Sequence, residues 1–128
     1  MLHHLSFAVS DLGRASAFYD DVLRALDYVR VWTFPDAVGY GPPGGGDKFA
    51  VIEAPAGGVA PPGCGFHLAF AAKSRAAVDA FYAAAIAKGA KDNGPPGLRP
   101  QYGPHYYAAF VIDLDGYEIE AVINEAVA

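Results

Sequence analysis

The chain is an approximate repeat of itself, and this feature constrains the fold more than any other. Residues 4–19 align without a gap on residues 67–82, and seven of the 16 positions are identical. A second match, Ile52-Glu53-Ala54 with Ile119-Glu120-Ala121, follows in the same order but with an offset of 67 instead of 63. Two separated matches in one order indicate a duplication, so the fold is expected to consist of two similar modules.

The first module is predicted to run strand, helix, strands. Leu5, Phe7 and Val9 alternate with smaller or polar residues, which is typical of a half-buried strand. Asp11 is a candidate N-cap for a helix. The apolar residues of that helix recur at helical spacing and form one face: Ala15, Phe18, Tyr19, Val22, Leu23 and Leu26. Further strands are predicted over residues 28–34, 37–40 and 48–54, and the Gly- and Pro-rich residues 55–65 form a linker.

The second module is predicted to repeat this order. Residues 67–71 form a strand, Ser74 is a candidate N-cap, and Gly89 can end the helix. The inner face of this helix is predicted from its apolar residues Val78, Phe81, Tyr82, Ala85 and Ile86. Residues 91–101 read as loop, and strands return at 106–113 and 117–123 around a tight turn at 113–116. We therefore predict one α+β domain over residues 1–128, with modules 1–54 and 66–124.

Composition excludes several classes of partner. The 9 basic and 14 acidic residues give a net charge of −5, so the chain lacks the basic surface that nucleic acids or anionic membranes require. No membrane span or signal peptide is recognisable, and a cytoplasmic location is expected.

Cys64 is the only cysteine. It lies in a Gly- and Pro-rich segment and is interpreted as a residue without a catalytic role. The charged fraction of 18% is below the usual value of about 25% and leaves room for a subunit interface.

Strand alternation places four potential metal ligands away from the helices. If Leu5 and Phe7 face their helix, His4 takes the opposite face, and the same argument turns His67 outward. Glu53 and Glu120 are assigned to the outer faces of their own strands. Imidazole and carboxylate donors suit a divalent ion such as Zn, Ni, Fe or Mn. The alternative is that these side chains are solvated, or that the fold retains a degenerate site without an ion.

The sequence resembles the vicinal oxygen chelate superfamily, the group of glyoxalases, bleomycin-resistance proteins and extradiol dioxygenases. His4-x-x-x-x-Val9-x-Asp11 with Ala17-Phe18-Tyr19 is similar to the opening motif of that family, and His67-Leu68-Ala69-Phe70 is similar to the start of its second module. Residues 113–120, Asp-Leu-Asp-Gly-Tyr-Glu-Ile-Glu, resemble its closing signature, with Leu114 where proline is usual. The resemblance implies paired βαβββ modules that form an open, cupped mixed sheet.

The resemblance also implies a metal centre and a type of chemistry. It assigns His4, His67 and Glu120 as ligands and matches Glu53 to the fourth ligand position of glyoxalase I. This set favours a metal-dependent, glyoxalase-like lyase or isomerase that acts on a small substrate with vicinal oxygens, with Glu120 or Glu53 as the base. The alternatives are a metal-free drug-binding protein of the bleomycin-resistance type and an Fe-dependent extradiol dioxygenase. Pairing of modules in this family also implies a homodimer.

The segment from Gly94 to Tyr107 departs from typical glyoxalase I, because it is longer and more aromatic. This difference leaves the use of glutathione as a co-substrate open. Four of its side chains are candidates for substrate binding at the mouth of a cleft: Arg99, Tyr102, His105 and Tyr107. The alternative is a surface loop in which the tyrosines only pack.

Overall fold

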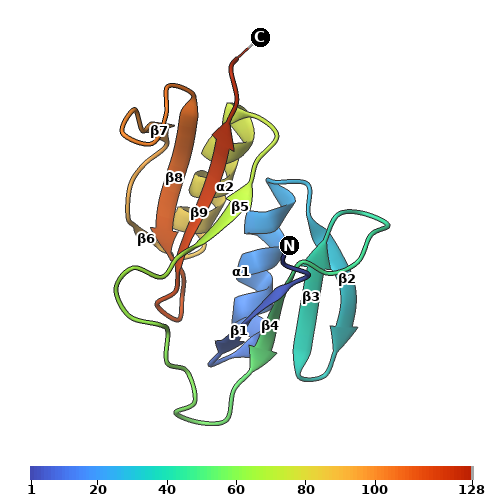
Figure 1. Ribbon diagram of the computed structural model, residues 1–128. Coiled ribbons are helices and arrows are strands. Elements are labelled where there is room, and N and C mark those ends of the chain that lie inside the picture. Colours follow the sequence, from blue (N-terminus) through green and yellow to red (C-terminus); the bar gives the residue numbers. More distant parts are fainter. Residues whose placement is uncertain (128) are drawn as a thin grey trace. The chain divides into compact units, whose positions relative to one another are not determined.

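The chain divides into two compact units that repeat one strand–helix–strand pattern. A computed structural model describes residues 1–127. The first unit covers Met1–Pro61 and the second begins at Pro62. Each unit holds one open, mixed sheet and one helix, so the predicted α+β class is confirmed (Figure 1). Within the described residues, neither helix is long and apolar enough to cross a membrane.

The first unit is a four-stranded sheet with one helix. Strand β1 pairs in parallel with β4, and β4, β3 and β2 follow as antiparallel neighbours (Figure 1). The elements agree with the predicted ranges to within one residue at nearly every strand end: β1 Leu5–Val9, α1 Leu12–Arg24, β2 Val29–Phe34, β3 Ala37–Gly41 and β4 Phe49–Glu53. Helix α1 begins where predicted, because the Asp11 carboxylate accepts a hydrogen bond from the Arg14 N–H at 3.1 Å.

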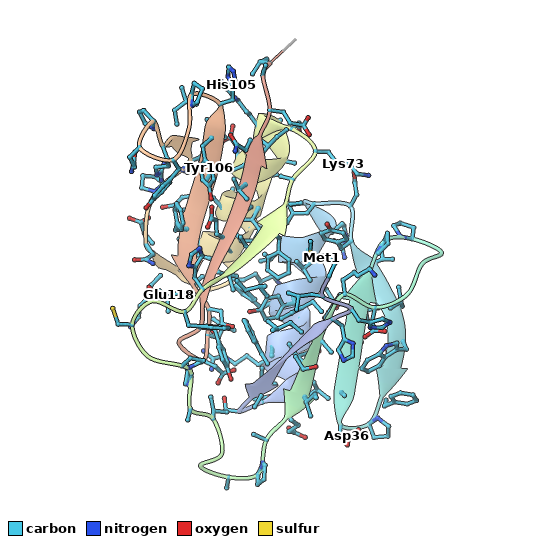
Figure 2. The ribbon with its side chains drawn as sticks, viewed as in Figure 1. Met1, Asp36, Lys73, His105, Tyr106 and Glu118 are labelled. Atoms are coloured by element: carbon cyan, nitrogen blue, oxygen red, sulfur yellow. The ribbon has the colours of Figure 1, made fainter. Side chains whose placement is uncertain are left out.

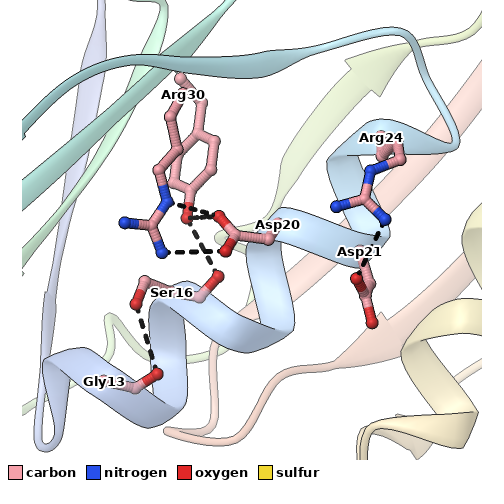
Figure 3. Close-up of polar contacts among 7 residues, drawn as sticks. Gly13, Ser16, Asp20, Asp21, Arg24 and Arg30 are labelled. Atoms are coloured by element: carbon pink, nitrogen blue, oxygen red, sulfur yellow. Dashed lines mark hydrogen bonds and ion pairs between the residues drawn. The ribbon is translucent and has the colours of Figure 1, made fainter.

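An ion pair joins α1 to β2. The Arg30 guanidinium donates to both carboxylate oxygens of Asp20, at 2.7 and 2.8 Å (Figure 3). The buried Tyr40 hydroxyl of β3 donates to Asp20 Oδ1 at 2.9 Å and also lies 3.1 Å from the Ser16 carbonyl. Burial, followed by the nearby Asp20 carboxylate, raises the pKa of Tyr40 well above its usual value. The three side chains therefore satisfy one another and serve the fold.

The second unit is a sheet ordered β5-β9-β8-β6, with β7 also paired to β8 (Figure 1). Its elements are β5 Leu68–Ala71, α2 Arg75–Ala87, β6 Lys91–Asp92, β7 Gly97–Leu98, β8 Tyr106–Ile112 and β9 Glu118–Asn124. The two-residue strands β6 and β7 lie in the segment that the sequence predicted as loop. Pairs this short are fixed by hydrogen bonds to β8 and leave no alternating pattern from which to predict them.

Helix α2 packs on its sheet through Val78, Phe81 and Ala85, each fully buried. Ser74 caps the helix by accepting from the Ala77 N–H at 3.0 Å, as predicted. The prediction for Ile86 is wrong, since this side chain is 38% exposed. Ile86 follows the fully buried Ala85 and is rotated about 100° around the helix axis from it, so its side chain lies at the edge of the buried face.

Candidate metal centre

His67 and Glu120 meet in the second unit. His67 directly precedes β5, and Glu120 lies on the neighbouring strand β9, opposite Ala69 in the parallel register. The His67 Nε2 atom is 2.9 Å from Glu120 Oε1. Glu120 is completely buried, whereas the His67 side chain is 49% exposed. A fully buried carboxylate is rare in proteins unless it is paired or binds a metal, so this residue marks the site.

The Oε1 atom of Glu120 lacks a hydrogen bond. It is one of two buried side-chain polar atoms without such a partner in residues 1–127, the other being Arg75 Nε. Its contact with His67 is short, but the geometry is not that of a hydrogen bond. Two ligands of one ion are arranged in this way, because both direct their lone pairs at the ion and not at each other. The donor set and the orphaned oxygen fit a divalent metal.

The other oxygen of Glu120 is held by Tyr106, which sequence reasoning did not select. The Tyr106 hydroxyl donates to Oε2 at 2.5 Å. Tyr106 is the first residue of β8 (Figure 2). Burial, and then this hydrogen bond to the carboxylate, raise the pKa of Tyr106 to about 12. Tyr106 therefore stays protonated and fixes the carboxylate with Oε1 turned to His67. Alternation along β8 was a usable signal, because it puts Tyr106 on the face of Phe110, which pairs with Glu120.

A hollow of about 240 Å³ lies beside the pair. Its lining residues are His67, Tyr102, Tyr106, Phe110 and Glu120. Aromatic rings form most of the wall, and the rings of Tyr102 and Tyr106 meet edge to face with centroids 5.3 Å apart. A few convergent polar groups in a largely apolar hollow are typical of a small-molecule site.

His4 lies in the first unit, next to two other potential ligands. Its Nδ1 atom is 2.7 Å from His3 Nδ1 and 4.0 Å from Asp47 Oδ2. One ligand atom from each of these three residues can be chosen within 4.8 Å of the others. His3 and His4 are exposed, and sequence analysis did not single out His3 or Asp47.

Glu53 lies away from His4, in contrast to the sequence prediction. It pairs with Val9, five residues beyond His4 and about 16 Å along an extended strand. It also shares the face of the buried Val51, and Glu53 Oε1 accepts from the Leu12 N–H at the start of α1, at 3.3 Å. The position equivalent to Glu120 is Ala50, which lies opposite Ser6 as Glu120 lies opposite Ala69.

The four candidate substrate-binding residues separate into different places. Tyr102 lines the hollow, and Arg99 lines a neighbouring one. His105 is exposed at the start of β8 (Figure 2). Tyr107 differs from the prediction: its hydroxyl donates to Asp79 of α2 at 2.7 Å, and this bond raises the pKa of Tyr107. Neighbours on a strand point to opposite faces, so Tyr107 turns to the helix when Tyr106 turns to Glu120.

Replacing Tyr106 by Phe tests the role of its hydroxyl. The variant leaves Glu120 Oε2 buried without a donor, which is expected to cost about 1–3 kcal/mol of unfolding free energy. Urea denaturation of metal-free protein measures this cost. Tyr82→Phe is the matched control, since Tyr82 lies on α2 and outside the hollow. Equal losses in the two variants would contradict a specific role for Tyr106.

Two units of one strand–helix–strand pattern, each with an open mixed sheet, define the glyoxalase-like class of α+β proteins. The chain belongs to the Glyoxalase/Bleomycin resistance protein/Dioxygenase superfamily, whose family model matches residues 1–121. The superfamily that the sequence motifs resemble is thereby confirmed.

Solved structures agree with this assignment. A glyoxalase/bleomycin resistance protein from Albidiferax ferrireducens T118 is 34% identical, with a TM-score of 0.81 over 95% of this chain and 97% of that one. A glyoxalase-related enzyme from Fulvimarina pelagi is 20% identical, with a TM-score of 0.72 over 97% and 88%. The fosfomycin resistance protein FosX from Listeria monocytogenes is 19% identical, with a TM-score of 0.69 over 95% and 91%. The last two show likeness of fold alone. No curated protein matches the sequence.

Proposed function

We propose that this protein is a metal-dependent enzyme, of the glyoxalase-like lyase or isomerase type, that acts on a small substrate with adjacent oxygens. The observation that carries the proposal is the fully buried Glu120, whose Oε1 has no hydrogen bond and lies 2.9 Å from His67 Nε2. A stable protein tolerates a buried carboxylate oxygen without a hydrogen bond when a further group, here a metal ion, binds that oxygen.

His67 and Glu120 are the proposed ligands, and His4 is proposed as a third. The first two are supported by their contact. His4 is retained because its place in the opening motif matches the superfamily pattern, and the chain belongs to that superfamily. Glu53 is omitted because it faces α1. A bound Zn, Ni, Fe or Mn ion would polarise a substrate oxygen and acidify the adjacent carbon.

The protein's own groups supply the proton transfer. The carboxylate of Glu120 is the base, and Tyr106 holds one of its oxygens in place. A carboxylate fixed in a hollow with aromatic walls can take a proton from a carbon bound in contact with it and return the proton to a neighbouring atom. Tyr102 and Phe110 line the same hollow and exclude water from the reacting atoms.

A direct screen tests the type of reaction. Methylglyoxal with glutathione or other thiols, catechols, and fosfomycin are each supplied with Ni, Zn, Mn or Fe. We expect turnover of an oxygen-chelating substrate without consumption of O₂, lost when the metal is removed by a chelator. Tight metal-free binding of an aromatic drug with no turnover would contradict the enzyme assignment and favour a sequestering protein.

A second candidate, the ring-cleaving dioxygenase, is favoured by the position of Glu53. With Glu53 on the helix side of its sheet, the proposed ligand set is two histidines and one glutamate. Such a set would suit Fe, which when bound would supply oxygen chemistry toward a catechol. Consumption of O₂ with a catechol in the presence of Fe(II) alone would decide for this candidate and against the lyase.

We also propose that the protein forms a homodimer. The charged fraction of 18% is low for a soluble chain, and exposed apolar side chains such as Phe34 and Ile52 are available for an interface. Sedimentation equilibrium at a protein concentration of about ten micromolar is expected to give twice the chain mass, and a monomer at this concentration would contradict the proposal.

A further inference from the structure

Arg99 is held in one place by the protein itself. Its guanidinium donates from Nη1 to the Gly97 carbonyl at 2.8 Å and from Nη2 to the Pro95 carbonyl at 2.6 Å. The backbone N–H of Arg99 donates to the Tyr106 carbonyl at 2.8 Å, so the residue is also tied to the first position of β8. An arginine immobilised in this way has already lost the side-chain freedom that binding an anion would otherwise cost.

The loop leaves room for this guanidinium by means of two glycines. A Cβ atom at Gly94 would lie 3.2 Å from Arg99 Nη2, and one at Gly97 would lie 3.2 Å from Nη1. A side chain at either position would therefore crowd the guanidinium of Arg99. The backbone is shaped around Arg99.

The charge of Arg99 is not neutralised by a carboxylate. In residues 1–127 the hydrogen-bond partners of the guanidinium are the neutral carbonyls of Gly97 and Pro95, and the guanidinium forms no ion pair. Two acids bonded to the adjoining residues 93 and 94 are engaged there, since Asp92 accepts from the Gly94 N–H and Glu118 accepts from the Asn93 amide. Of its five N–H donors, three are available to a ligand. By contrast, Arg30 in the first unit is paired with Asp20.

Phe110 connects Arg99 to the His67–Glu120 pair. The guanidinium carbon lies 5.3 Å from the centroid of the Phe110 ring, and the His67 ring lies 6.3 Å from the same centroid. The two groups are therefore no more than about 12 Å apart, the sum of those distances. Arg99 lines a hollow of about 300 Å³ that shares Tyr102 and Phe110 with the hollow of Glu120. One ligand with a single ring can span both.

We propose that Arg99 anchors the carboxylate of a small organic acid whose oxygen-donor end occupies the hollow of His67 and Glu120. The inference rests on the proposed metal-dependent function, which supplies the ion for the oxygen donors. The planar fork of arginine matches a carboxylate, with which it forms charge-assisted hydrogen bonds. The substrate class is accordingly an acid with adjacent oxygens at one end and a carboxylate at the other.

Two probes that differ only in charge test this anchor. The acid 3,4-dihydroxybenzoate and its neutral analogue 3,4-dihydroxybenzamide present the same adjacent oxygens and are titrated into Zn-loaded protein by calorimetry. We expect the acid to bind at least about tenfold more tightly than the amide, as a charge-assisted hydrogen bond implies. Arg99→Gln is expected to abolish this preference and leave the affinities for the amide and for Zn unchanged. Arg24→Gln, which removes an exposed arginine outside both hollows, is the control and should retain the preference.

A second measurement separates this inference from the proposed function. In the wild-type, metal-free protein, benzoate is expected to shift the side-chain Nε resonance of Arg99 in an NMR titration. A shift with benzoate in a protein that fails to bind Zn would refute the metal centre and retain the carboxylate anchor. Equal affinities for the acid and the amide in Zn-loaded wild type, or a preference that persists in Arg99→Gln, would overturn the anchor and leave the metal centre standing. An unshifted Nε resonance would also count against it.

Discussion

His67→Ala is expected to lower the affinity of the protein for a divalent ion by more than about 100-fold. Even the outer-shell partners of metal ligands change affinity 10–100-fold when removed, and His67 Nε2 lies beside the orphaned Glu120 Oε1. The affinity is measured by competition of Zn against a chromophoric chelator. The fold should survive, because His67 lies outside β5 and its side chain is half exposed.

His105→Ala is the matched control for this variant, since His105 is exposed and lines neither hollow, and its removal is expected to leave the affinity unchanged. His3→Ala tests the other group of nearby ligand atoms, formed by His3, His4 and Asp47. A large loss of affinity in His3→Ala, with none in His67→Ala, would move the metal centre to the N-terminal cluster and contradict the assignment made here.

Glu120→Gln is expected to reduce kcat by about 100-fold or more and to weaken substrate binding much less. The amide keeps the shape of the side chain and still accepts from Tyr106, but it cannot take a proton, and general-base catalysis contributes about 10²–10⁴ in rate. The assay is run with metal content measured in each sample, so that loss of the ion and loss of the base are distinguished. Turnover is compared once a substrate has emerged from the screen.

Glu118→Gln is the control for the base. Glu118 lies two residues earlier on the same strand, accepts from the Asn93 amide at 3.2 Å, and does not line the hollow of Glu120. Its replacement should leave kcat within about twofold, as expected for a change away from the reacting atoms. Equal losses in the two variants would indicate a general effect of charge on this strand, and not a base at Glu120.

Much of the fold was predictable because burial imposes periodic patterns on the sequence. Phe18, Val22 and Phe81 lie at helical spacing and are buried in the structure, and the Asp11 and Ser74 caps begin the helices where expected. The ranges of β8 and β9 agree with the alternating segments of the second module. Strands β6 and β7 escaped prediction because two residues carry no period.

The site was predictable in part, and the part that failed depended on strand register. The identity of Ile52-Glu53-Ala54 with Ile119-Glu120-Ala121 suggested equivalent strands, but pairing with β1 makes Ala50 the counterpart of Glu120. A shift of this size is invisible in one sequence, and an odd shift reverses every side chain. Glu53 consequently faces α1, where its carboxylate accepts from the N–H of Leu12. Tyr106 was overlooked because its neighbour Tyr107 is the same residue type on the other face.

Titration of metal-free protein with Co(II) tests the central claim most directly. Absorption bands in the visible region report the geometry and number of ligands, and they require no substrate. Saturation is expected at about one ion per chain, with bands typical of nitrogen and oxygen ligands, which are lost in His67→Ala and changed in position and intensity in Glu120→Gln. Saturable bands that persist unchanged in both variants, or the absence of any saturable band in the wild-type protein, would contradict a metal centre at His67 and Glu120.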